Sequence, residues 1–250
     1  MAGHSKWANI KHRKARQDAA KSKIFTRIIR ELTVSAREGG GDVSANPRLS
    51  LALENAKAAN MPKDNIERAI KKGTGEIEGE SYEEVIYEGY GPSGVAYFVE
   101  CTTDNNTRTV AEVRFIFSKH GGNLGTIGSV AYLFNQKGII TINSEGLDED
   151  EVMLTAIDAG AEDVKHEDGQ FEISTTRETL YAVRTALEEA GYTIESADLQ
   201  RIPTTEVELD EENAIANLKL MEKLEDNDDV TNVFTNIKMN EVVLAASEKL

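Results

Sequence analysis

The 250-residue sequence predicts an α+β protein with more than one domain. Apolar residues recur at helical spacing through residues 18–73, whereas strand-like and helix-like segments alternate from residue 84 onward. A stretch rich in glycine and glutamate, residues 73–80, separates these regions and is typical of a linker. We therefore expect a helical N-terminal domain followed by α+β domains.

Three helices are expected in the N-terminal region. The first covers about residues 18–38, and its apolar face comprises Ile24, Phe25, Ile28, Ile29 and Leu32. The pair Asn46–Pro47 suits the start of a second helix that runs to about Asn60. A third helix should run from Pro62 to Gly73.

The rest of the chain alternates between strands and helices. Strands are expected at residues 84–90 and 95–103, joined by a Gly-Pro-Ser-Gly turn, then a helix at about 107–119 and a short strand at 130–134. Residues 138–202 predict the order strand, helix, strand, strand, helix, strand, with segments at 138–142, 149–159, 163–167, 171–174, 177–190 and 193–202. A further strand, helix and strand follow at 204–209, 211–224 and 230–236.

The order βαββαβ is that of a ferredoxin-like module. The last strand-helix-strand unit would complete a second module of similar plan together with the segments before residue 135. The expected domains are thus residues 1–80, a basic helical domain with an N-terminal arm; residues 81–135 with 204–250, a discontinuous α+β domain; and residues 136–203, an inserted ferredoxin-like domain.

Charge is distributed very unevenly. Residues 1–72 carry 16 of the 28 Lys and Arg residues against 7 Asp and Glu, which gives a net charge of +9. The remaining residues have a net charge of −25, so the whole chain sums to −16. A basic end attracts polyanions through phosphate contacts and counterion release, whereas an acidic body repels them. This asymmetry predicts a nucleic-acid partner at the N-terminal end.

The arm before the first helix is the strongest local signal. Its basic side chains can contact phosphates, and the indole of Trp7 can stack on an unpaired base. A basic stripe on the first helix, formed by Lys23, Arg27, Arg30 and Arg37, continues the same sign of charge. The predicted nucleic-acid-binding residues are Lys6, Trp7, Lys11, His12, Arg13, Lys14, Arg16, Lys21, Lys23, Arg27 and Arg30. The alternatives are a solvated tail whose tryptophan docks on its own domain, and a merely solvated helix face.

Two other motifs have structural alternatives. The short connection Asn60–Pro62 would suit a helix-turn-helix, with Arg68, Lys71 and Lys72 facing a groove, although short connections occur in every helical bundle. The segment before the helix at 107–119 could hold an anion with help from Arg108. Simple capping of that helix by Asp104 or Asn106 is the favoured interpretation.

Catalytic, metal and cofactor sites find no support in the sequence. The histidines are scattered, and Cys101 has no partner at ligand spacing. We recognise no nucleophilic triad and no phosphate-binding loop, so we expect a protein that is not an enzyme. The single cysteine and the lack of an 18-residue apolar stretch or signal peptide predict a cytoplasmic protein without a membrane partner.

Three segments, residues 2–10 (AGHSKWANI), 60–66 (NMPKDNI) and 87–94 (YEGYGPSG), closely resemble the YebC/PmpR family, and the resemblance extends over the whole chain. It implies a three-domain fold in which one of two α+β domains is inserted in the other. Bacterial members are described as DNA-binding transcriptional regulators, and the mitochondrial relative as a translational activator. Members have also been linked to ribosomes stalled on proline runs. The family offers no established catalytic residues.

The expected function is therefore that of a DNA-binding regulator of transcription, and the chain is expected to be a monomer. The alternative is a ribosome-associated translation factor that binds ribosomal RNA and relieves stalled translation. In that alternative the acidic body could contact basic ribosomal proteins while the arm reaches RNA.

Overall fold

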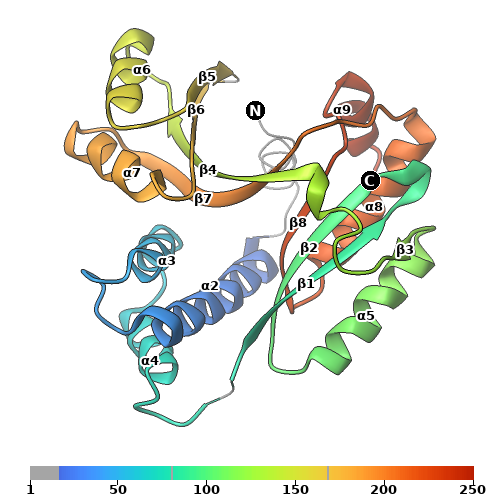
Figure 1. Ribbon diagram of the computed structural model, residues 1–250, viewed down its shortest axis with the longest axis horizontal. Coiled ribbons are helices and arrows are strands. Elements are labelled where there is room, and N and C mark those ends of the chain that lie inside the picture. The colour runs from blue at the N-terminus through green and yellow to red at the C-terminus, as the bar shows by residue number, and fades with distance from the viewer. Residues whose placement is uncertain (1–16, 80, 168) are drawn as a thin grey trace. The chain divides into compact units, whose positions relative to one another are not determined.

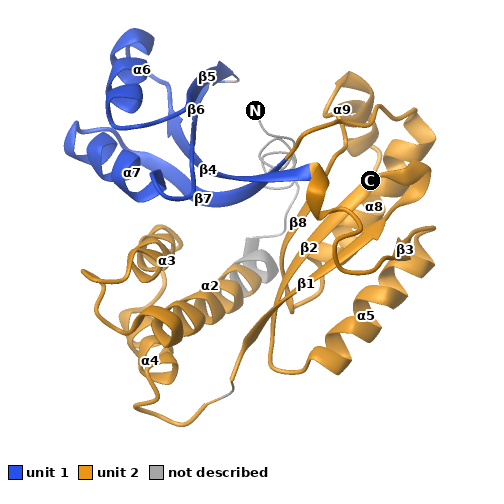
Figure 2. Cartoon of the chain, in the orientation of Figure 1, with its two compact units in different colours: residues 1–2, 134–202 blue, residues 3–133, 203–250 orange. Residues whose placement is uncertain are grey.

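The computed structural model describes residues 17–79, 81–167 and 169–250, with side chains described from Lys23 onward. The chain forms two compact units (Figure 2). One unit comprises residues 134–202, and the other comprises the described residues before 134 together with residues 203–250. The architecture is α+β, with a helical N-terminal region and two four-stranded sheets. None of the helices in the described part is long and apolar enough to span a bilayer.

The N-terminal region contains the three expected helices (Figure 1). They are α2 (Gln17–Gly39), α3 (Pro47–Ala58) and α4 (Lys63–Gly73). Both α3 and α4 pack on α2. Their shared core contains Leu32, Ala36, Leu49, Ala52, Ala56, Met61, Ile66 and Ala69. Phe25, Ile28 and Ile29 pack against it, as the apolar face of the sequence predicts, whereas Ile24 is 39% exposed.

Asn46 fixes the start of α3, as its cap position predicts. Its Oδ1 accepts a hydrogen bond from the backbone N–H of Leu49 at 3.0 Å. Its Nδ2 donates to the carbonyls of Ser35 and Gly40, both at 2.8 Å. The side chain is buried, so this one residue caps α3 and ties it to the end of α2.

The first sheet lies in the same unit as these helices. Its strands are β1 (Glu83–Tyr90), β2 (Ala96–Thr103), β3 (Asn123–Leu124) and β8 (Val230–Thr235), in the spatial order β3-β1-β2-β8. Neighbouring strands in this sheet run antiparallel. The accompanying helices are α5 (Asn106–Lys119), α8 (Glu211–Glu225) and α9 (Glu241–Ser247), with short 3-10 turns η1 (Pro92–Gly94) and η2 (Ala131–Leu133).

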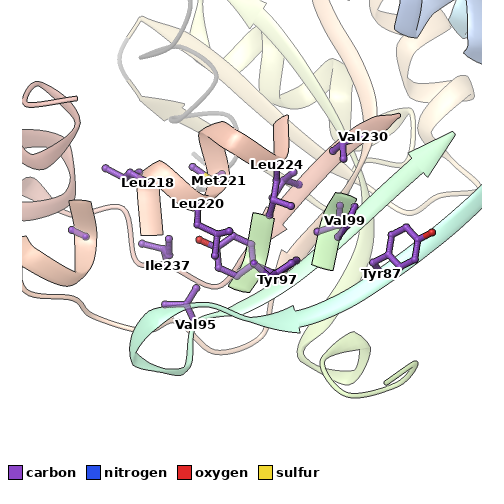
Figure 3. Close-up of a cluster of buried hydrophobic side chains, with 14 of the residues drawn as sticks. Tyr87, Val95, Tyr97, Val99, Leu218, Leu220, Met221, Leu224, Val230 and Ile237 are labelled. Carbon is purple, nitrogen blue, oxygen red and sulfur yellow. The ribbon is translucent and has the colours of Figure 1, made fainter. Parts of the chain in front are cut away.

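The core of this unit forms where the sheet meets α5 and α8. Figure 3 shows side chains from β2, including Tyr97 and Val99, facing Leu220 and Leu224 of α8. Tyr97 is fully buried and meets the ring of Phe117 edge-on at 5.6 Å between centroids. Its hydroxyl lies 2.9 Å from the carbonyl oxygen of Asn217, so the buried phenol keeps a hydrogen-bond partner.

The second unit contains β4 (Phe134–Asn143), α6 (Glu149–Asp158), β5 (Asp163–Glu167), β6 (Gln170–Thr175), α7 (Leu180–Glu189) and β7 (Ile194–Pro203). This is the predicted order of elements, and the sheet order is β5-β6-β4-β7. Strand β6 runs antiparallel to both β4 and β5. The first turn of α6 is capped by Asp148, which accepts from two backbone N–H groups.

Two predicted strands were wrong, and one helix was not predicted. Residues 130–134 form no separate strand, because η2 precedes Phe134, where β4 begins. Residues 204–209 make only one bridge, between Val207 and Ile237, rather than a strand. Helix α9 was not predicted, because its seven residues are too few for helical periodicity to stand out.

Candidate nucleic-acid interface

Most of the residues predicted to contact nucleic acid lie outside what the structure describes. These are the arm residues Lys6, Trp7, Lys11, His12, Arg13, Lys14 and Arg16, together with the side chain of Lys21. Lys23, Arg27 and Arg30 are described, and all three project from α2. Their surroundings decide what the basic stripe does within the chain.

Lys23, Arg27 and Arg30 of the stripe contact an acidic segment, residues 225–229, which joins α8 to β8. Lys23 Nζ lies 3.4 Å from Asp226 Oδ1. Arg27 Nη2 donates to the carbonyl oxygen of Glu225 at 2.8 Å. That carbonyl ends α8, where the helix dipole favours a cation. The stripe is therefore engaged within its own unit.

Arg30 makes the densest set of these contacts. Its Nη1 donates to the carbonyl oxygens of Thr102 at 2.8 Å and Asp228 at 2.5 Å. The same nitrogen lies 3.1 Å from Asp229 Oδ1. The guanidinium carbon lies 5.3 Å from the centre of the Tyr82 ring, a cation–π distance. Arg30 thus connects α2 to the end of β2 and to the acidic segment 225–229.

Asp229 receives several donors at the other end of this contact. Arg108 Nη2 donates to its two oxygens at 2.7 and 3.0 Å, and Thr109 Oγ1 donates at 2.7 Å. Burial by itself would raise the pKa of Asp229. Hydrogen bonds from Arg108 and Thr109 and the charges of Arg30 and Arg108 outweigh that effect, so the pKa is lowered. The carboxylate is held ionised.

Arg108 is accordingly occupied by carboxylates, since it also bonds Asp104 at 2.8 Å. The N-cap of α5 is Asn105, whose Oδ1 accepts from the backbone N–H of Arg108 at 3.1 Å. The prediction that Asp104 or Asn106 caps this helix was wrong. Three consecutive residues could each act as a cap, and sequence alone does not fix which of them takes the cap position.

Helix α4 carries basic side chains that are not engaged by other described residues. Arg68 and Lys71 are exposed and Lys72 is half-buried. Within the described residues, none of these three side chains forms an ion pair or hydrogen bond. By contrast, Arg48 is surrounded by Glu31, Glu38 and Glu84. The exposed face of α4 therefore keeps cations that could contact phosphates.

A helix-turn-helix is not favoured by the packing of α3 and α4. Asn60 in their connection has a positive φ of 56°, and the buried Met61 anchors the turn. Both helices lie on α2, and they make few contacts with each other. In a helix-turn-helix the recognition helix is supported by the helix before it. The basic face of α4 thus offers charge rather than a groove-reading motif.

Among residues 17–79, 81–167 and 169–250, no three or more His, Cys, Asp or Glu side chains are arranged to hold a metal ion. Burial, with a further contribution from Asp229, raises the pKa of the Cys101 thiol to about 12. A buried and protonated thiol is a poor nucleophile.

Comparison with known proteins assigns the family. The family model described as "TACO1/YebC protein N-terminal domain" matches residues 5–76, and "TACO1/YebC second and third domain" matches residues 82–237. A "Probable transcriptional regulatory protein" of Persephonella marina is 58% identical over 246 residues, which is 98% of each chain. One of the same description from Geobacter sulfurreducens is 55% identical over 240 residues, covering 96% of this chain and 97% of the relative.

A solved structure is similar over most of the chain. The crystal structure of a conserved hypothetical protein from Aquifex aeolicus matches with a TM-score of 0.83 and 50% sequence identity. The match covers 90% of this chain and 93% of that one. With both family models and these full-length relatives in agreement, the chain belongs to the TACO1/YebC family.

Proposed function

We propose that the chain is a regulator of gene expression that binds DNA and controls transcription. The observation that carries this proposal is the charge split, +9 for residues 1–72 against −25 for the remainder. The relatives described as probable transcriptional regulatory proteins support it, since they match almost the whole chain. A polyanion is attracted to one end of such a molecule and repelled by the other.

The binding surface would combine the arm with the exposed face of α4. The arm supplies Trp7 and closely spaced basic residues, and α4 supplies Arg68 and Lys71, which have no partner among the described residues. Both belong to the basic N-terminal region. Lys23, Arg27 and Arg30 have a structural role in the contact with residues 225–229, and their binding of nucleic acid stays a prediction.

Cellular crosslinking followed by sequencing tests this function. The proposal predicts enrichment at promoter DNA, with specific affinity well above non-specific binding at physiological salt. Crosslinks confined to ribosomal RNA, with co-sedimentation of the chain with ribosomes, would contradict transcriptional control.

A ribosome-associated translation factor is the second candidate, favoured by the acidic body. A net charge of −25 on residues 73–250 disfavours long naked DNA but complements basic ribosomal proteins. The arm would then bind ribosomal RNA, where Trp7 could stack on an unpaired base. The same crosslinking experiment separates the two candidates.

We further propose that the chain works by binding, without catalysis, in the cytoplasm. Turnover of DNA, RNA or a nucleotide that depends on a metal and is abolished by one carboxylate substitution would contradict the absence of catalysis.

The proposed domains are residues 1–80, residues 81–135 with 204–250, and an inserted domain at 136–203. The order β5-β6-β4-β7, with β6 antiparallel to two neighbours, supports a ferredoxin-like inserted domain.

A further inference from the structure

One surface loop differs from the rest of the acidic body. Residues 121–136 contain no Asp, Glu, Lys or Arg, although 29% of the chain is charged. Within this stretch, residues 125–133 connect β3 to β4 and are here named the 125–133 loop. A polyanion meets less local repulsion at an uncharged loop than at the charged surface elsewhere on the body.

Glu88 holds the backbone of this loop in place. Its Oε1 accepts from the N–H of Gly128 at 2.6 Å, and its Oε2 accepts from Val130 and Ala131, both at 2.7 Å. The Glu88 side chain is buried at 4% exposure. Bonds between backbone N–H groups and a carboxylate are stronger than neutral ones, so three of them fix the loop from within.

Further contacts anchor both ends of the loop. The N–H of Gly125 donates to the carbonyl of Glu88 at 2.7 Å, and the N–H of Thr204 donates to Leu133 at 2.8 Å. The hydroxyl of Tyr90 donates to the carbonyl of Ser129 at 2.7 Å. Gly128 has φ of +86°, a conformation that other residues rarely adopt. The loop is therefore preorganised.

This ordered loop presents an apolar side chain to solvent. Ile127 is 92% exposed, more than any other large apolar residue that the structure describes, while Val130 nearby is fully buried. Tyr132 is 72% exposed. The buried hydroxyl of Ser129 has no hydrogen-bond partner among the described residues. A rigid loop with an exposed isoleucine and an unsatisfied hydroxyl has the features of a binding element.

We propose that the 125–133 loop is a second nucleic-acid contact, in which Ile127 packs against or between bases. Apolar side chains, including isoleucine, serve as wedges between base steps in proteins that deform nucleic acid. The inference rests on the proposed function and extends it to a base-contacting element in the α+β body. Charged arm residues would supply attraction, and Ile127 would supply an apolar contact.

The size of the exposed apolar surface favours bases over a protein partner. Ile127 and Tyr132 together offer on the order of a few hundred Å². A stable protein interface buries roughly 800 Å² on each side, whereas one wedge side chain suffices at a base step. The neighbouring exposed residues Asn123 and Thr126 are neutral hydrogen-bonding groups, which suit base edges and avoid charge repulsion.

The test measures binding of the full chain to a single-stranded oligonucleotide and to a duplex, each carrying 2-aminopurine, at 50 and 200 mM salt. Ile127→Ala should weaken binding about tenfold, by the same factor at both salt concentrations, because an apolar contact releases no counterions. It should also remove the rise in 2-aminopurine fluorescence that unstacking produces. Leu154→Ala is the matched control, since Leu154 is 64% exposed on α6.

Each outcome bears on a different claim. If the wild type binds and Ile127→Ala binds equally well, with an unchanged fluorescence response, the loop inference is wrong while the proposed function stands. If the wild type fails to bind either oligonucleotide, the proposed function fails, and the loop inference fails with it. A loss in Ile127→Ala that changes the salt dependence would also overturn the apolar role.

Discussion

Arg30 Nη1 and Asp229 Oδ1 lie 3.1 Å apart, although the sequence separates them by almost two hundred residues. The side chains are only 13% and 4% exposed. This ion pair joins the basic helix α2 to the acidic segment 225–229, so a basic and an acidic part of the chain meet inside one unit. Removing one partner of a largely buried pair leaves the other charge uncompensated.

Asp229→Asn should therefore destabilise the protein. The variant loses the charge that faces both Arg30 and Arg108, and a broken buried pair costs about 3–5 kcal/mol. The free energy of unfolding in urea, with circular dichroism as the signal, measures the change. A loss of less than about 1 kcal/mol would show that the pair contributes no more than a surface salt bridge.

Glu208→Gln provides the control for that measurement. Glu208 pairs with Lys238 at 2.7 Å, but the pair is on the surface. The substitution removes one negative charge, as Asp229→Asn does, but it leaves no buried cation without its partner. We expect the same unfolding midpoint as in the wild type.

The pH dependence of stability should report Asp229 as well. Its pKa is lowered in the folded state, so its contribution is fully present above the unfolded value of about 3.9 and is lost as the pH falls through the lower folded value. The stability gap between wild type and Asp229→Asn should be constant from pH 5 to 7 and narrow below about pH 4. A gap that widened on acidification would contradict the direction of the shift.

Substitutions on α4 should change the salt dependence of nucleic-acid binding. Arg68→Gln with Lys71→Gln removes two exposed cations that have no partner in the described chain. If each contacts one phosphate, the negative slope of log affinity against log salt should become shallower by about 2. Fluorescence anisotropy over a salt series measures this slope.

Lys57→Gln is the control for the α4 variant, because Lys57 already pairs with Glu54 at 2.7 Å. It should leave the slope within experimental error of the wild type. An equal loss in the control and the α4 variant would indicate a general effect of net charge rather than contacts on α4.

Much of the fold could be predicted from local patterns. Helix α2 was expected at about residues 18–38 and extends from Gln17 to Gly39, because its apolar face and the glycines after it are local signals. Asn46 was correctly predicted as the cap of α3, because the pair Asn46–Pro47 is itself a local signal of a helix start. The strand and helix order of residues 134–202 also followed from periodicity and turn residues.

Contacts between distant segments could not be predicted in this way. Lys23, Arg27 and Arg30 have the spacing of a solvated basic face, and nothing near them in sequence indicates that residues 225–229 cover it. The three N–H groups that meet Glu88 are likewise about forty residues away. Tertiary packing decides whether such charges remain available to a ligand.

The most direct test of the account compares the full chain with a variant lacking residues 1–16, measuring affinity for DNA between 50 and 200 mM salt. If the arm neutralises about five phosphates, affinity of the full chain should fall roughly 500-fold over this range. The truncated variant should lose most of this affinity and salt dependence while keeping its unfolding midpoint. Unchanged affinity in the truncated variant, in the same buffer, would contradict the claim that the basic arm binds nucleic acid.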